Sequence, residues 1–243
     1  MRRTVLITGS ARRLGAALAC GLARDGHRIA VHYRTSRAEA EETARVIQKE
    51  GGEADVFQSP LASLADGEDL VGKIASHWGN IDTLINNAGT FVGKRFDELT
   101  QHDWETGLAS TAGAAFVATR AALPHLRTSG RGRIVQIGDV MSARLEPVDS
   151  AMSYYIGKAG VWRMTQTLAT SEARHGITVN LVSPGVLEDS VCETPIGEMP
   201  SGRYGTYEDV LHTIRFLLDE RSQAVTGSHL QVGGGWKIAP GAQ

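Results

Sequence analysis

The chain has 243 residues, of which 42% are hydrophobic and 21% are charged, an ordinary composition for a globular protein with a sizeable core. The formal net charge of -2 gives no electrostatic reason to expect binding to nucleic acid or to an acidic membrane surface. Runs of apolar residues are too short to predict a membrane-spanning helix.

The cysteine content and the first residues bear on the cellular compartment. Cys20 and Cys192 are the two cysteines, and neither has the spacing of a metal-ligand set. This pattern favours a reducing compartment and predicts no metal site, although two cysteines are in principle able to pair. The start, MRRTVLITGS, passes directly from two arginines into a strand-like run, which predicts a cytoplasmic protein without a targeting peptide.

Short β-rich apolar runs alternate with segments of helical periodicity along the whole chain. The predicted strands are 5–8, 28–33, 54–58, 83–86, 133–137, 178–182 and 228–232. The predicted helices are 14–23, 36–50, 64–78, 104–126, 152–173 and 207–218. No linker, repeat or low-complexity tract divides them, so we expect one α/β domain over residues 1–243, with a Rossmann-like, doubly wound parallel sheet covered by helices on both faces.

In such a fold, ligands bind at the carboxyl ends of the strands. The first of these loops reads TGSARRLG, and its glycines allow a tight turn and the approach of a pyrophosphate to the helix N-terminus. Arg13 stands where the fuller fingerprint has a middle glycine. Two arginines at the positive end of a helix dipole are unfavourable unless a bound anion offsets their charge. The loop therefore predicts phosphate contacts from Gly9, Arg12, Arg13 and Leu14.

The loop after the second strand, HYRTS, lacks the acid with which NAD enzymes hold the ribose 2′-hydroxyl. Arg34, Thr35 and Ser36, together with Arg12, offer cationic and hydroxyl donors that suit a 2′-phosphate. The alternative is a solvated polar loop. We predict NADPH as the cofactor, with His32 and Tyr33 also beside it.

Tyr154 and Lys158 lie four residues apart, so on a helix their side chains share one face. A nearby ammonium group stabilises a phenolate and lowers its pKa, which would equip Tyr154 as a general acid. An isolated Y-x-x-x-K is more often part of an ordinary amphipathic helix, so the rest of the chain decides between the two interpretations.

The glycine loop, NNAG at 86–89, Tyr154-x-x-x-Lys158 and NLVSPG at 180–185 occur in the order of the short-chain dehydrogenase/reductase family, which the chain resembles over nearly its whole length. The resemblance implies a single Rossmann domain that forms dimers or tetramers and transfers hydride from a nicotinamide. It implies that Tyr154 donates a proton and that Lys158 holds the nicotinamide ribose and lowers the pKa of the tyrosine. It also implies further cofactor contacts from Leu61, Asn87, Ala88, Gly89, Pro184, Gly185 and Val186.

A finer resemblance is to the pteridine reductases. Asp139 ends the fifth strand, where ordinary family members carry a serine. Arg13 in place of the middle glycine, the HYRTS-type loop and Ile156-Gly-Lys also match that sub-family. The resemblance implies that a pterin stacks between Phe91 and the nicotinamide, with Arg13 at its polar edge. Asp139 and Tyr154 would then supply protons.

Some positions depart from the family pattern. Thr111 stands where an asparagine is usual, and Pro60 stands where an acid normally touches the adenine. Asp139 and Tyr154 are 15 residues apart, about two more than in the family, and the loop at 187–199 is short and rich in acids, Glu193 among them. These departures predict a reshaped substrate site.

Three interpretations follow. The main hypothesis is a cytoplasmic, homo-oligomeric NADPH-dependent reductase of dihydropterin or dihydrofolate-type substrates. The second is a carbonyl reductase of 3-oxoacyl or quinone substrates, against which the missing serine counts. The third, of another class, is an NADPH-binding sensor or structural protein with degraded catalysis. None of them involves nucleic acid, a membrane or a metal.

Overall fold

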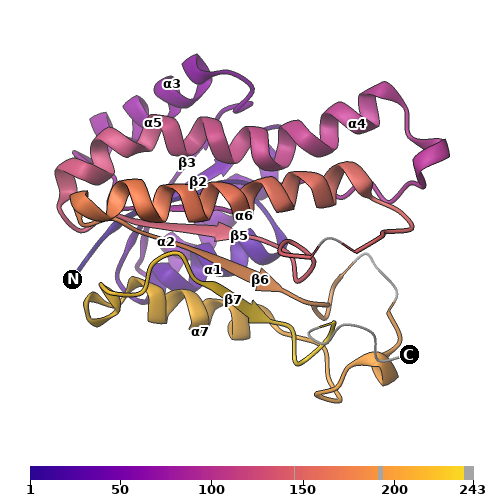
Figure 1. Ribbon diagram of the computed structural model, residues 1–243. Helices are drawn as coiled ribbons and strands as arrows, with labels where there is room; N and C mark the ends of the chain where they lie inside the picture. The colour runs from indigo at the N-terminus through magenta and orange to yellow at the C-terminus, as the bar shows by residue number, and fades with distance from the viewer. Residues whose placement is uncertain (145, 191–193, 238–243) are drawn as a thin grey trace.

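A seven-stranded parallel sheet forms the centre of the molecule (Figure 1). Its strands are β1 (Thr4–Ile7), β2 (Arg28–Tyr33), β3 (Glu53–Gln58), β4 (Thr83–Asn86), β5 (Arg133–Ile137), β6 (Thr178–Pro184) and β7 (His229–Val232). They lie in the order β3-β2-β1-β4-β5-β6-β7, and every neighbouring pair is parallel. The predicted doubly wound sheet in a single domain is therefore confirmed.

The computed structural model describes residues 1–144, 146–190 and 194–237. Cys192 and Glu193, named in the sequence analysis, lie outside the described residues. Cys20 is partly buried in the first helix.

Helices cover both faces of the sheet. They are α1 (Arg13–Arg24), α2 (Arg37–Lys49), α3 (Leu64–Trp78), α4 (Gln101–Leu108), α5 (Ala114–Ser129), α6 (Met152–Glu172) and α7 (Tyr207–Leu218). Short 3-10 segments occur at Phe96–Glu98, Ala173–His175, Ile196–Glu198 and Glu220–Ser222. Helices α3 to α6 lie on one face, and α1, α2 and α7 lie on the other. None of the helices in the described part of the chain is long and apolar enough to cross a bilayer.

The two faces of the sheet explain why its strands are apolar almost throughout. On β1, Val5 and Ile7 pack into the core under α1, α2 and α7, whereas Leu6 between them packs into the core under α3 and α5. All three side chains are fully buried. Parallel strands covered on both sides lose the alternation of polar and apolar residues, which is the pattern that the sequence displays.

Most predicted boundaries agree with the structure to within one or two residues, with one informative difference. The segment predicted as a single helix over 104–126 is divided by a π-helical turn at Ala109–Gly113 and extends from Gln101 to Ser129. Such turns interrupt the regular ladder of helical hydrogen bonds and are frequent at functional sites. Periodicity does not reveal this turn, because the residues on both sides of it remain helical.

Candidate active site

A pocket of about 630 Å³ opens at the carboxyl ends of the strands, where β1 lies between β2 and β4 and the strand order reverses. Every residue that the sequence analysis assigned to cofactor, substrate or catalysis lines this pocket, although their roles remain predictions. These residues are Gly9, Arg12, Arg13, Leu14, His32, Tyr33, Arg34, Thr35, Ser36, Leu61, Asn87, Ala88, Gly89, Phe91, Asp139, Tyr154, Lys158, Pro184, Gly185 and Val186.

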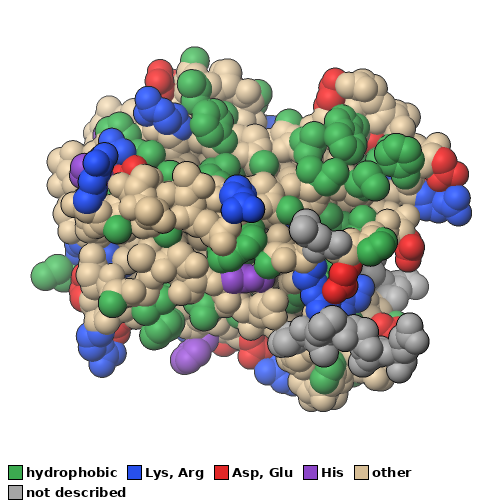
Figure 2. Space-filling model, viewed as in Figure 1, with side chains coloured by type: hydrophobic (Ala, Val, Ile, Leu, Met, Phe, Trp, Pro, Cys, Tyr) green, Lys and Arg blue, Asp and Glu red, His purple; other side chains and the backbone are tan. Residues whose placement is uncertain are grey.

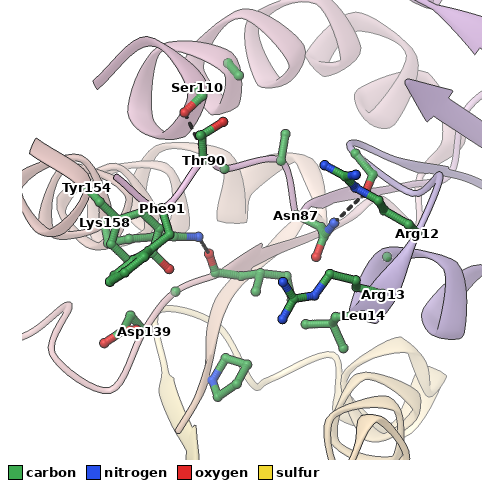
Figure 3. A pocket seen from close by; sticks show the side chains of 18 of the residues that line it. Arg12, Arg13, Leu14, Asn87, Thr90, Phe91, Ser110, Asp139, Tyr154 and Lys158 are labelled. Atoms are coloured by element: carbon green, nitrogen blue, oxygen red, sulfur yellow. Dashed lines mark hydrogen bonds between the residues drawn. The ribbon is translucent and has the colours of Figure 1, made fainter. Parts of the chain in front are cut away.

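Figure 3 shows that the pocket has two chemically different ends. One end holds the arginines of the first loop, and the other holds the tyrosine, the lysine and the aspartate. Asn87 lies nearer the first end, and its side-chain amide donates to the carbonyl oxygens of Thr8 and Gly9, each at 3.0 Å. These bonds tie the loop after β4 to the loop after β1, so that both loops form one wall.

The helix N-termini at the arginine end are not capped by a side chain of a described residue. Arg12 and Ser36 occupy the N-cap positions of α1 and α2, and neither side chain forms a capping hydrogen bond. Elsewhere, Ser63, Thr100 and Thr206 cap α3, α4 and α7 with complete capping boxes. Uncapped amides at a helix N-terminus attract anions. The prediction that Ser36 starts α2 is correct, but its hydroxyl group is left available to a ligand.

The arginines of this end differ in their partners. Arg12 and Arg34 are exposed, and within the described residues neither forms an ion pair. Arg13 instead pairs with Asp189, with 3.0 Å between Nε and Oδ2, and it also donates to the Asp189 carbonyl oxygen. Tyr207 donates to the same carboxylate. The structure therefore places Arg13 at the pocket but gives it a partner in the acidic loop that the sequence did not indicate.

His32 is 3% exposed and lies behind the loop after β1, for which the sequence predicts phosphate contacts. The Gly9 N–H group donates to its Nδ1 atom at 2.9 Å, and its Nε2 atom lies 3.0 Å from the carbonyl oxygen of Ser59. Burial lowers the pKa of His32 to about 4. The ring is therefore neutral near pH 7, and its polar atoms are already engaged by the protein.

At the other end, α6 positions Tyr154 and Lys158 one turn apart, as predicted. Lys158 Nζ donates to the carbonyl oxygen of Ile137 at 2.6 Å and lies 5.4 Å from the centroid of the Tyr154 ring. Burial lowers the pKa of Lys158 to about 8, and the charge of Asp139 opposes that shift. The bond to the end of β5 fixes the ammonium group beneath the pocket.

The pKa of Tyr154 differs from what the family resemblance implies. Burial raises it well above its usual value, and the charge of Asp139 and the neighbouring Tyr155 raise it further. The net pKa of Tyr154 is therefore raised in this structure, chiefly by desolvation and by the Asp139 carboxylate, and the lowering by Lys158 stays a prediction of the resemblance. A protonated hydroxyl group at neutral pH is the form that is able to donate a proton.

Asp139 follows β5 and lines the pocket at the end that holds Tyr154 (Figure 3). Its N–H group donates to Ser142 Oγ at 2.7 Å, and its carboxylate accepts from the Met141 N–H group at 2.9 Å. Burial raises the pKa of Asp139, whereas the Met141 bond and the charge of Lys158 lower it. The carboxyl group therefore holds a proton more readily than an exposed aspartate does.

Aromatic rings surround this end of the pocket. The Phe91 ring is 39% exposed and meets the Tyr154 ring edge to face, with 5.2 Å between their centroids. Tyr155 lies 6.5 Å from Phe91 and 5.4 Å from Tyr154. Figure 2 shows hydrophobic side chains gathered at the end of the molecule where α4 lies. This apolar surface suits a substrate with a flat apolar face.

Thr111 lies in the π-helical turn behind Tyr154, where the family usually has an asparagine. Its Oγ1 atom donates to the carbonyl oxygen of Gly107 at 2.6 Å, and the side chain is buried. Gly157, next to Lys158, packs directly on Thr111: a Cβ atom at that position would lie 1.8 Å from Thr111 Oγ1. The close approach of α6 to the turn therefore depends on glycine at position 157.

Replacing this glycine by alanine (Gly157→Ala) is expected to destabilise the protein by about 1 to 3 kcal/mol, the usual cost of an overpacked core. Thr111 is held by its bond to Gly107 and has little room to yield. Urea unfolding followed by circular dichroism measures the change. Gly72→Ala on α3 is the matched control, because its Cβ atom would meet nothing within 4 Å. Equal stability of the two variants would contradict this packing.

Several pocket residues were missed by the sequence analysis. Trp236 comes from the segment after β7, beyond the last predicted strand. Ser110, in the π-helical turn, accepts a hydrogen bond from the Thr90 N–H group at 3.0 Å. Pro60, noted only as a departure from the family, also lines the pocket. Among the described residues, no His, Cys, Asp and Glu side chains group as metal ligands.

The sequence profile of the short chain dehydrogenase family matches residues 3–199. The fold and the pocket already define a protein of the Rossmann-like α/β type, and with this match the chain belongs to the short chain dehydrogenase family.

Proteins similar to this chain are named as reductases or dehydrogenases. The chain is 33% identical to a 3-oxoacyl-[acyl-carrier-protein] reductase of Aggregatibacter actinomycetemcomitans and 28% identical to that of Staphylococcus epidermidis, covering 97% of this chain and 99% of each relative. It superimposes on a dehydrogenase/reductase from Sinorhizobium meliloti with a TM-score of 0.89 and 29% identity, over 97% of this chain and 95% of the other. Superposition on acetoin dehydrogenase from Enterobacter cloacae gives a TM-score of 0.89 and 26% identity, over 100% of this chain and 99% of the other.

Proposed function

We propose that this protein is an NADPH-dependent reductase whose pocket holds the cofactor phosphates at the arginine end and the reacting groups at the tyrosine end. The N-termini of α1 and α2, which lack a side-chain cap, support an anionic ligand with more than one phosphate. The exposed guanidinium groups of Arg12 and Arg34, which form no ion pair with any described residue, support it too. A bound nicotinamide supplies the hydride for the reduction. Tyr154 donates the proton to the substrate, and Lys158 holds the ribose.

Arg34→Ala tests the preference for NADPH over NADH. The exposed guanidinium group beside Ser36 suits a 2′-phosphate, so its loss is expected to weaken NADPH binding by about tenfold, within the range of one hydrogen bond to a charged group. NADH, which lacks that phosphate, is expected to bind as before. Fluorescence titration with both cofactors measures the change. An equal loss for NADH would assign Arg34 to the shared part of the cofactor.

The substrate that the site geometry favours is a planar ring with nitrogen atoms, of the dihydropterin or dihydrofolate class. The observation that carries this proposal is Asp139, a partly buried carboxyl group with a raised pKa beside Tyr154. A carboxyl group pairs with ring N–H groups or gives a proton to a ring nitrogen, which a serine hydroxyl does less readily. The exposed ring of Phe91 offers a surface for stacking.

The second candidate is reduction of a 3-oxoacyl carbonyl group. The relatives favour it over the pterin class, because they are named 3-oxoacyl-[acyl-carrier-protein] reductases and align with nearly the whole chain. Tyr154 would donate its proton to the carbonyl oxygen instead of to a ring, and Lys158 would hold the ribose as before. The aspartate in place of the expected serine counts against this candidate.

A panel of substrates separates the candidates. NADPH oxidation is followed by its absorbance with dihydrobiopterin, dihydromonapterin, dihydrofolate, an acetoacetyl thioester and a quinone. We expect turnover of the pterins. Turnover of the thioester or the quinone alone would select the carbonyl reductase. NADPH binding without turnover of any of them would favour a sensor or structural role with degraded catalysis.

We also propose that the protein acts in the cytoplasm as a homo-oligomer, a dimer or a tetramer. The rings of Phe116 on α5 and Phe216 on α7 are each 50% exposed, which supports burial of both helices against other copies. Light scattering on the purified protein measures the number of subunits, and a monomer at micromolar concentration would contradict the proposal.

A further inference from the structure

The imidazole ring of His32 joins two segments of the cofactor pocket that are distant in the sequence. Its Nδ1 atom accepts a hydrogen bond from the N–H group of Gly9, in the phosphate loop, and its Nε2 atom donates to the carbonyl oxygen of Ser59, after β3. The backbone of His32 is also paired with Ser10: the Ser10 N–H group donates to the His32 carbonyl oxygen at 2.9 Å, and the His32 N–H group donates to Ser10 Oγ at 3.0 Å.

These partners determine the protonation state of the ring. The N–H group of Gly9 is only a donor and the carbonyl group of Ser59 is only an acceptor, so the neutral tautomer with hydrogen on Nε2 satisfies both. A protonated ring would direct an N–H group at the Gly9 N–H group. Burial, which lowers the pKa of His32 to about 4, favours the neutral form near pH 7.

Gly9 lines the pocket, and Ser59 directly precedes the lining residues Pro60 and Leu61. Gly9 has a φ of 64°, and a Cβ atom there would lie 3.1 Å from Ala88 Cα, so the loop has little freedom to shift toward β4. Ser59 Oγ accepts from the N–H group of Leu61 at 3.2 Å, and Leu61 is a buried pocket residue with a φ of 49°. The ring therefore spans the distance between the phosphate loop and the wall at Leu61.

We propose that His32 is a positioning residue for NADPH, whose ring holds the Gly9 loop and the Ser59 segment at the spacing that receives the phosphate-bearing half of the cofactor. The inference rests on the proposed NADPH binding and gives the ring no part in proton transfer. It predicts that changes at His32 act on cofactor affinity and leave the chemistry at Tyr154, at the other end of the pocket, nearly unaffected.

Three variants separate the two bonds of the ring. His32→Leu removes both, His32→Asn keeps an acceptor near the position of Nδ1, and His32→Gln keeps a donor near the position of Nε2. Fluorescence titration is expected to show NADPH binding weakened by about tenfold or more in His32→Leu, since a buried N–H group is left unpaired. His32→Asn is expected to recover much of this loss, and kcat at saturating NADPH should stay close to that of the wild type.

His27→Leu is the matched control. The Arg3 N–H group donates to His27 Nδ1 at 3.1 Å, so this variant also deletes a backbone-to-imidazole bond, but at the amino edge of the sheet, away from the pocket. It is expected to bind NADPH as the wild type does, even if it unfolds more easily. Equal loss of affinity in His27→Leu and His32→Leu would show a general effect of instability and overturn the inference.

A measurement on the unliganded wild type does not depend on any variant folding. The nitrogen chemical shifts of the His32 ring are expected to report the neutral tautomer protonated at Nε2 at neutral pH, and a ring protonated at Nδ1 would overturn the inference. Wild-type affinity in His32→Leu would overturn it while leaving the proposed function intact. Failure of the wild type to bind NADPH would overturn both.

Discussion

Tyr154→Phe is expected to lower kcat by about 10²- to 10⁴-fold, the usual contribution of a general acid. The variant removes one oxygen atom and retains the ring, so the edge-to-face contacts with Phe91 and Tyr155 are kept. Because burial and the charge of Asp139 raise the pKa of the hydroxyl group, it is protonated at neutral pH and able to donate. The affinity for NADPH should change little, which titration of the purified variant measures.

Tyr155→Phe is the matched comparison for this loss. Tyr155 is the next residue on α6, also lines the pocket and belongs to the same aromatic group. Lys158 Nζ lies over the ring of Tyr154, 5.4 Å from its centroid, so replacement of Tyr155 should cost far less activity. Turnover by Tyr154→Phe at a rate near that of the wild type would remove the tyrosine from the mechanism, whatever the substrate is.

Asp139→Ser is expected to change the substrate preference. Pterin reduction should fall by about 10²-fold, at the lower end of the range for loss of a proton donor. Carbonyl reduction should fall less or increase, since a serine hydroxyl is a neutral donor to a carbonyl oxygen. The loss of charge also removes one cause of the raised pKa of Tyr154. Steady-state rates with dihydrobiopterin and an acetoacetyl thioester measure both effects in the same preparation.

Asp139→Asn separates shape from proton transfer, because the amide keeps the size of the side chain and its acceptor for the Met141 N–H group but has no acidic proton. The pterin hypothesis predicts that Asn and Ser variants lose pterin reduction to a similar degree. If carbonyl reduction falls more than pterin reduction in either variant of Asp139, the pterin class is rejected in favour of the 3-oxoacyl class.

The sheet was predictable because its strands are buried on both faces and are separated by helices with clear periodicity. The location of the site was predictable for a related reason: in a parallel sheet all carboxyl ends meet at one edge, so the loops that follow the strands must converge there. Gly9, Asn87 and Asp139, which follow three different strands, line one pocket as this rule requires.

Features that depend on contacts between distant side chains were not predictable. The partner of Arg13 is Asp189, 176 residues later in the chain, and no local pattern marks either residue for the other. Trp236 lines the pocket from beyond the last strand. The upward direction of the pKa shift of Tyr154 comes from burial and from the neighbouring Asp139 and Tyr155, which spacing along a helix does not reveal.

The most direct test of the central claim is to follow the hydride itself. The protein is incubated with NADPH that carries deuterium at both C4 positions and with the pterin or the thioester of the panel that it turns over, and the mass of the product is measured by mass spectrometry. The proposed reductase predicts that the product gains one deuterium atom and that Tyr154→Phe yields little of this product. NADPH consumption without deuterium in the reduced substrate would contradict hydride transfer in this pocket.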